Sequence, residues 1–331
     1  MINRVLFYNS GGGIGDAIQI LPLINTLKNE LIGTKFYYLS AHENHFNSTL
    51  KDLNCEIETL DLKIRYFGFR WWHALIVKKR LEKKNIESFD LILDLQSKIR
   101  NSLILKIIPH KKFISSCFNF KLSKPILNIK KENKIDKTIL KAINIMFEKN
   151  YQFSEYNIDK IHKKFHFESK KLLPKKNYVG LSITQGNIYR KKEWTLNNII
   201  KISNVLLKNN KIPVFFIEKE NIQLKNKINK LIPAALFPEH ESELSGPALV
   251  SCLGKRLDFA ISIDNGVMHM LSLSKVPMIS LFGPTDSEKF APGYKHSIVL
   301  DSKKLYNTKN ISSISVEDVL QAAKQHLNFS Y

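Results

Sequence analysis

The sequence predicts an α/β protein with two facing domains, each built on a parallel sheet. The length of 331 residues fits two domains of ordinary size. In both halves, short apolar runs alternate with segments of helical periodicity, the pattern of strands that are buried on both faces. A polar, basic stretch over residues 151–176 separates the halves. We therefore expect Rossmann-like domains over residues 1–165 and 177–315, and a final helix over 316–331, for which packing on the N-terminal domain is one option.

The N-terminal half opens with an apolar run, RVLFYNS over residues 4–10, which ends at a glycine-rich turn and predicts a buried strand. Helical spacing follows over residues 14–31, where Pro22 predicts a kink because proline has no backbone N–H to donate. Similar patterns predict strands at 35–40, 89–95 and 112–116, and helices at 75–84 and 137–147.

The C-terminal half repeats this alternation. Apolar runs predict strands at 178–184, 212–217, 257–263 and 276–282. Helical patterns cover residues 194–209, 266–274 and 316–329, and a further helix is expected to begin at about residue 221. Thr195 is a typical cap for the first of these helices. Ligands of open parallel sheets bind beyond the carboxyl ends of the strands, so two facing sheets predict a site in a cleft between the domains.

Composition excludes several classes of protein. With 44% hydrophobic and 24% charged residues, the chain is neither a disordered tail, a collagen-like fibre nor a disulfide-stapled miniprotein. The net charge is +21, and residues 1–175 hold 31 basic against 17 acidic residues, a net of +14. This field favours an anionic acceptor or membrane surface, with compositional drift as the alternative. We expect no nucleic-acid partner, because no RNP-type aromatic motif or basic helix accompanies the charge.

The cysteines and the apolar runs indicate in which cellular compartment the protein is expected. Cys55, Cys117 and Cys252 form no CxxC pair, which indicates a reducing compartment and no structural zinc. No run of ~18 apolar residues is present, and the N-terminal run reaches glycine too early for a secretory signal. We expect a cytoplasmic protein, with peripheral contact at the inner face of the cytoplasmic membrane as an option.

The first candidate for chemistry is the glycine-rich turn GGGIGD, residues 11–16. Glycines between a strand and a helix let backbone N–H groups approach an anion or a sugar. A dinucleotide fingerprint is excluded because Asp16 stands where its third glycine belongs, and a P-loop is excluded because Gly-Lys-Ser/Thr is absent. Asp16 is then either an ionised carboxylate that accepts a proton or a helix-start residue stabilised by the helix dipole.

Two further candidates lie in the C-terminal half. Residues 264–269 (DNGVMH) follow one predicted strand and open a helix, where a glycine exposes backbone amides to a phosphate. Asp264 could instead be the helix cap, and His269 a buried structural histidine. In the run RKKEW at 190–194, Lys192 either neutralises a leaving diphosphate or is a surface charge.

Together these segments resemble glycosyltransferase family 9, the bacterial lipopolysaccharide heptosyltransferases. The resemblance spans nearly the whole chain and is carried by Gly15-Asp16 with Leu21-Pro22, Lys192-x-Trp194, Asp264-x-Gly266-x-x-His269, and Val276-Pro277 before Phe282-Gly283-Pro284-Thr285. It implies the two-domain GT-B fold and transfer of a sugar from a nucleotide diphosphate sugar, typically ADP-heptose, to a lipid-linked anionic glycan acceptor of the lipopolysaccharide type. The resemblance also implies that the transfer inverts the anomeric carbon.

The resemblance also implies roles for individual residues. Asp16 is the general base, Lys192 faces the diphosphate, and Glu220 binds the ribose, with Glu218 or neither acid as the alternatives. The implied set comprises the catalytic residues Asp16 and Lys192, the donor-binding residues Thr184, Glu220, Asp264, Asn265, Gly266 and His269, and the acceptor-side glycines Gly12, Gly13 and Gly15. The family commonly has Thr where Asn265 stands.

No metal cofactor is expected. Metal-dependent sugar transfer commonly uses an Asp-x-Asp pair, and this sequence contains none. The charge would come instead from Lys192, the helix start at Gly266, and His269. Two alternatives to the heptosyltransferase are a related transferase that uses another nucleotide sugar and a non-catalytic nucleotide-sugar-binding protein, although Asp16 and Lys192 argue against the second.

Overall fold

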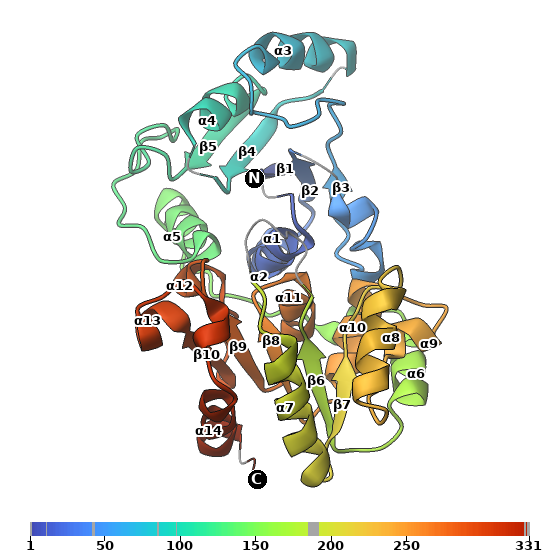
Figure 1. Cartoon of the computed structure of the whole chain (residues 1–331). Helices are drawn as coiled ribbons and strands as arrows, with labels where there is room; N and C mark the ends of the chain where they lie inside the picture. Colours follow the sequence, from blue (N-terminus) through green and yellow to red (C-terminus); the bar gives the residue numbers. More distant parts are fainter. Residues whose placement is uncertain are drawn as a thin grey trace. The chain divides into compact units, whose positions relative to one another are not determined.

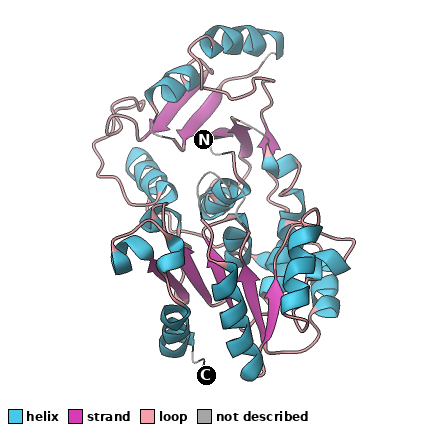
Figure 2. Cartoon of the chain, viewed as in Figure 1, coloured by secondary structure: helices cyan, strands magenta, loops and turns pink. Residues whose placement is uncertain are grey.

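The computed structural model describes residues 2–10, 12–41, 44–84, 86–96, 98–184, 192–327 and 329, with residues 326 and 327 described in their backbone. The chain divides into two compact units, Met1–Tyr156 and Asn157–Tyr331 (Figure 1). Each unit contains one five-stranded parallel sheet with helices around it (Figure 2). The predicted fold class of two Rossmann-like α/β domains is confirmed.

The N-terminal sheet has the strand order β3-β2-β1-β4-β5. Its strands are β1 (Arg4–Asn9), β2 (Lys35–Ser40), β3 (Glu58–Thr59), β4 (Phe89–Asp94) and β5 (His110–Ser115), and its longer helices are α1 (Ile14–Gln19), α2 (Leu21–Glu30), α3 (His73–Lys84), α4 (Ile99–Leu105) and α5 (Ile135–Phe147). The single kinked helix predicted after β1 is in fact two helices. Pro22 lies in the first turn of α2, where its missing N–H costs no helical hydrogen bond, and the chain breaks at Ile20.

The C-terminal sheet has the order β10-β9-β8-β6-β7. Its strands are β6 (Tyr178–Ser182), β7 (Ile212–Phe215), β8 (Phe259–Ile263), β9 (Met278–Phe282) and β10 (Ser297–Asp301). The helices are α6 (Lys163–Leu172), α7 (Leu196–Lys208), α8 (Ile222–Leu231), α9 (Pro238–Glu241), α10 (Pro247–Gly254), α11 (Gly266–Ser272), α12 (Ser287–Phe290), α13 (Ser302–Tyr306) and α14 (Val316–Leu327). Thr195 caps α7 as predicted, accepting from the Asn198 N–H at 3.3 Å.

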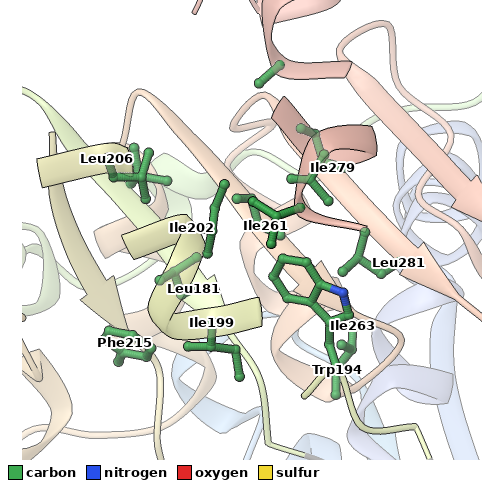
Figure 3. Packing of buried hydrophobic residues seen from close by; sticks show 14 of the residues in the cluster. Leu181, Trp194, Ile199, Ile202, Leu206, Phe215, Ile261, Ile263, Ile279 and Leu281 are labelled. Atoms are coloured by element: carbon green, nitrogen blue, oxygen red, sulfur yellow. The ribbon is translucent and has the colours of Figure 1, made fainter. Parts of the chain in front are cut away.

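Trp194 anchors the core of the C-terminal unit. Its ring packs among Ile199, Ile263 and Leu281 (Figure 3), and its Nε1 donates to the Ile314 carbonyl at 2.8 Å. The final helix α14 contributes side chains such as Val319 to the same core, so it packs on the C-terminal sheet. The option that this helix packs on the N-terminal domain stays a prediction.

The segment expected to connect the domains contains regular structure. The units divide after Tyr156, earlier than the expected boundary at residue 165. Helix α6 packs on α10 within the C-terminal unit, and the Phe165 side chain is buried. The basic residues of α6 therefore occupy the solvent face of a packed helix.

The three cysteines are buried and form no disulfide. Among the described residues, none of the helices combines the length and the apolar character needed to cross a bilayer.

Candidate active site

The glycine-rich turn of the N-terminal unit is held by side-chain hydrogen bonds. Asp16 is half-buried in the first turn of α1. Its backbone carbonyl accepts from Asn9 Nδ2 at 3.2 Å, and Asn9 Oδ1 accepts from Gln96 Nε2 at 2.9 Å. Asn9 ends β1 and Gln96 follows β4, so the carboxyl ends of two neighbouring strands fix the start of α1. Gly11 lies outside the described residues.

Two residues beside this turn were not singled out from the sequence. Burial and the nearby negative charge of Asp16 raise the pKa of the Tyr38 hydroxyl, on β2, far above its ordinary value. The buried His45 donates from Nε2 to the Gly12 carbonyl at 3.2 Å, and its Nδ1 lies 3.0 Å from Thr49 Oγ1. A lone histidine at the start of a short 3-10 helix carries no spacing signal that could have revealed this contact.

Lys192 and Asp264 form a buried ion pair in the C-terminal unit. Lys192 Nζ donates to Asp264 Oδ2 and, at 3.0 Å, to the Asp264 backbone carbonyl. The same Oδ2 accepts from Thr285 Oγ1 at 2.6 Å. Lys192 is 9% exposed and Asp264 6%, so the surface interpretation of Lys192 is wrong. Its basic neighbours Arg190 and Lys191 lie outside the described residues.

Asn265, rather than Asp264, caps α11. Its Oδ1 accepts from the Met268 N–H at 2.9 Å. Its Nδ2 donates to Ser182 Oγ at 2.7 Å and to the Thr184 carbonyl at 2.8 Å, so the side chain ties the end of β6 to the start of α11. The interpretation of Asp264 as the cap is therefore wrong. A threonine at position 265 could cap the helix but could not donate to both acceptors.

Of the two acids considered for ribose, the structure places Glu218 against Thr184, whose Oγ1 donates to Glu218 Oε1 at 3.0 Å. Glu220 is exposed in the turn that follows. A third acid, the buried Glu239 at the start of α9, was not predicted. Burial and the nearby negative charge of Glu218 raise the pKa of the Glu239 carboxyl to about 7.

This shift leads to a pH-dependent stability. The unfolded Glu239 loses its proton near 4.5 and the folded one near 7, so the folded state binds more protons between these values and its stability falls as pH rises. Glu239→Gln removes this penalty. We expect its free energy of unfolding to exceed that of the parent by about 1–3 kcal/mol above pH 7, and the gain to vanish in acid. Urea unfolding across the pH range measures it, with the exposed Glu241→Gln on the same helix as control. A pH-independent difference would contradict the assignment.

Gly266 and Gly283 differ in the space that a side chain would have at each position. A Cβ on Gly266, the first residue of α11, would meet only Met270 Cε, at 3.9 Å. On Gly283 it would lie 2.6 Å from the Lys309 carbonyl, so that position needs glycine for packing. His269, also on α11, is buried, and its backbone carbonyl accepts from Ser272 Oγ at 2.7 Å.

The predicted site residues therefore form two groups, one in each unit. The N-terminal group consists of Gly12, Gly13, Gly15 and Asp16, and the C-terminal group of Thr184, Lys192, Asp264, Asn265, Gly266 and His269, with Glu218 added. The first group offers a carboxylate and the second a fixed cation beside a helix start. Within the part of the chain that the structure describes, no cluster of three or more His, Cys, Asp or Glu could hold a metal ion. Metal independence stays a prediction.

Comparison with known proteins gives consistent results. The model of glycosyltransferase family 9 (heptosyltransferase) matches residues 76–320, well over half of the chain. No curated protein matches the sequence. Among solved structures, the Escherichia coli heptosyltransferase WaaC with ADP has a TM-score of 0.72 at 13% identity, over 98% of this chain and 99% of that one.

Two other solved structures share the fold. The family 9 glycosyl transferase from Veillonella parvula has a TM-score of 0.71 at 17% identity, over 99% of this chain and 98% of that one. The E. coli ADP-heptose lps heptosyltransferase II has a TM-score of 0.68 at 13% identity, over 99% of each chain. These similarities show the GT-B fold, which is built from two Rossmann-like domains. With the family model matched over most of its length, the chain belongs to glycosyltransferase family 9 and is a glycosyltransferase.

Proposed function

We propose that this glycosyltransferase moves heptose from ADP-heptose to a lipopolysaccharide-type acceptor, with inversion at the anomeric carbon. The observation that carries the proposal is the buried Lys192–Asp264 pair next to the open start of α11. A lysine ammonium is costly to bury, and here an aspartate holds it where a donor diphosphate would need a counter-charge. ADP is named first because WaaC was solved with ADP and with ADP-2-deoxy-2-fluoro heptose.

In the proposed donor site, the diphosphate competes with Asp264 for the Lys192 ammonium and takes further stabilisation from the Gly266 N–H. Asp264 positions the lysine through two contacts, one of them to its own backbone carbonyl. The ribose hydroxyls are assigned to Glu218, whose carboxylate Thr184 already orients. His269 and Asn265 are assigned to the same donor site at α11. Asn265 acts indirectly, by holding the end of β6 against the start of α11.

In the proposed reaction, the acceptor hydroxyl gives its proton to the Asp16 carboxylate. The acceptor oxygen forms a bond to the anomeric carbon from the face opposite the diphosphate. The bond between this carbon and the diphosphate oxygen breaks, and ADP leaves with the bonding electrons. Negative charge grows on the departing diphosphate, where the fixed Lys192 stabilises the transition state more than the ground state.

A thermal-shift comparison tests the donor. ADP, ADP-heptose, UDP and UDP-N-acetylglucosamine are added to the purified chain, and the unfolding temperature is recorded. A ligand at ~100 times its Kd stabilises the folded state by about 2.7 kcal/mol. We expect stabilisation by the adenine compounds alone. Stabilisation by the uridine compounds alone would replace the heptosyltransferase with a transferase for another nucleotide sugar.

For the acceptor, we propose a lipid-linked anionic glycan at the inner face of the cytoplasmic membrane, reached by a cytoplasmic protein in peripheral contact. The support is the net charge of +14 in residues 1–175, the half that holds Asp16.

Gly266→Ala separates a ligand contact from a packing role. Because the protein leaves room for the new methyl group, we expect an unfolding temperature near that of the parent. Donor affinity should fall by roughly 10–100-fold, as the methyl group hinders the hydrogen bond from the helix start to a charged phosphate. Calorimetry with ADP measures the affinity. Gly283→Ala is the matched control and should lower stability instead. Unchanged ADP affinity in Gly266→Ala would remove this contact from the account.

Metal independence is tested by initial rates. We expect full activity in excess EDTA, because Lys192 and backbone amides supply the charge that a cation would carry. Activity lost in EDTA and restored by Mg²⁺ or Mn²⁺ would contradict this mechanism.

A further inference from the structure

Helix α3 has apolar side chains on its solvent face as well as on its buried face. His73, Val77 and Leu81 are buried and attach the helix to the N-terminal unit. On the solvent face, Leu75 is 75% exposed, and Trp72, directly before the helix, is 59% exposed. Exposed apolar side chains that gather in one place mark an interaction surface more often than scattered ones do.

These side chains belong to one continuous stripe. Leu75, Ile76, Lys79 and Lys83 lie along one side of α3, and Trp72, the residue directly before the helix, continues their i, i+3, i+4, i+7 and i+11 spacing. All five are exposed. We call them the α3 stripe. Trp71, 60% exposed, precedes it in the chain. In Figure 1, α3 lies on the outside of the N-terminal unit, beside α4.

The stripe lies in a strongly basic part of the chain. Residues 63–84 contain eight Lys or Arg and one acidic residue, Glu82. The Arg70 guanidinium lies 5.6 Å from the centre of the Trp72 ring, so cation and aromatic ring present one combined surface. A partner must therefore accept bulky apolar groups and a high density of positive charge together.

We propose that the α3 stripe, with Trp71, docks on the surface of a bilayer that contains anionic lipids. Tryptophan rings favour the headgroup region, and leucine and isoleucine insert among the acyl chains. Lysine stems lie along the apolar surface while their ammonium groups meet lipid phosphates. The proposal rests on the proposed function in one respect, the location of the acceptor in such a membrane.

The chain carries its own probe for this contact. It has three tryptophans, and Trp194 is buried in the C-terminal core, so iodide quenching and vesicle-induced spectral shifts report on Trp71 and Trp72. The full chain is mixed with vesicles of phosphatidylcholine, or of equal parts phosphatidylcholine and phosphatidylglycerol. With the anionic vesicles we expect co-sedimentation, a blue shift and protection from iodide, all weakened by salt. Equal binding to both vesicle types, or to neither, would overturn the proposal.

Two double variants divide the contact into its parts. Leu75→Gln with Ile76→Gln keeps the charge, and Ile32→Gln, 89% exposed, is its control. We expect the double variant to lose vesicle affinity by roughly tenfold or more and the control to keep it.

Lys79→Gln with Lys83→Gln should weaken binding by roughly 10–30-fold at low salt. Its control, with the same loss of charge on α7, is Lys201→Gln with Lys208→Gln, both exposed. An equal loss of vesicle affinity in the control would show that only the net charge matters, and would overturn the proposal that the α3 stripe is the docking surface.

A last arm separates this proposal from the proposed function. Transfer to a soluble, deacylated acceptor should be unchanged in all four variants, because the stripe acts on the membrane. If the parent protein transfers sugar to the soluble acceptor but does not bind vesicles, the docking proposal is overturned and the proposed function stands. Protection of Trp71 and Trp72 from iodide by the soluble acceptor, with none by vesicles, would also overturn it, since the surface would then bind the glycan.

Discussion

Replacing Asp16 by Asn is expected to lower turnover by about 10²–10⁴-fold, the usual loss for a general base. Asparagine cannot take the proton of the acceptor hydroxyl, whereas the hydrogen bond from Asn9 Nδ2 uses the backbone carbonyl of this residue and survives the substitution. Donor affinity and unfolding temperature should therefore stay close to those of the parent. Steady-state rates with ADP-heptose and calorimetry with ADP measure the two effects separately.

Asp136→Asn is the matched control for this substitution. Asp136 is a half-buried acid in the first turn of a helix of the same unit, α5, and lies in a segment for which we propose no chemistry. We expect a change in stability there and a normal rate. If Asp16→Asn transferred sugar at the parental rate, Asp16 would be a helix-start residue only.

Lys192→Ala should abolish measurable transfer and destabilise the fold by about 3–5 kcal/mol, because it leaves the buried Asp264 carboxylate without its cation. Urea unfolding measures the second effect. Lys211→Ala is the control in the same unit. It removes a more exposed pair with Asp258, side chains 24% and 33% exposed, and should cost about 1 kcal/mol or less.

The double variant Lys192→Ala with Asp264→Asn separates the structural and functional parts of this effect. Without the carboxylate there is no unpaired buried charge, so most of the lost stability should return. Donor affinity should not return, because the counter-charge for the diphosphate is still missing. A folded double variant with parental ADP affinity would show that Lys192 serves the fold and not the donor.

Sequence patterns predict most of this fold because buried parallel strands are short apolar runs between turns. The helix α10 was missed for a related reason. All eight of its residues are buried, so it has no polar face to produce a helical period. Pro22 was interpreted as a kink, whereas the first turn of a new helix accommodates proline without strain.

The site was predictable in its residue types and not in its contacts. Lys192 stands in a basic run that is typical of a solvent face, and its burial depends on Asp264, 72 residues further along the chain. Likewise, the contact between His45 and Gly12 joins two segments that share no local pattern. Glu239 lies in the short helix α9. Burial and the neighbouring Glu218 raise the pKa of its carboxyl, and neither cause can be seen in a sequence.

The most direct test of the central claim is one reaction with two readouts. The purified chain is incubated with ADP-heptose, with and without a heptose-free lipopolysaccharide acceptor. ADP release is followed in time, and the anomeric configuration of the product is determined by NMR. We expect ADP release that depends on the acceptor and a heptosyl product with the configuration inverted from that of the donor. A product of retained configuration, or consumption of a uridine diphosphate sugar while ADP-heptose stays intact, would contradict the account.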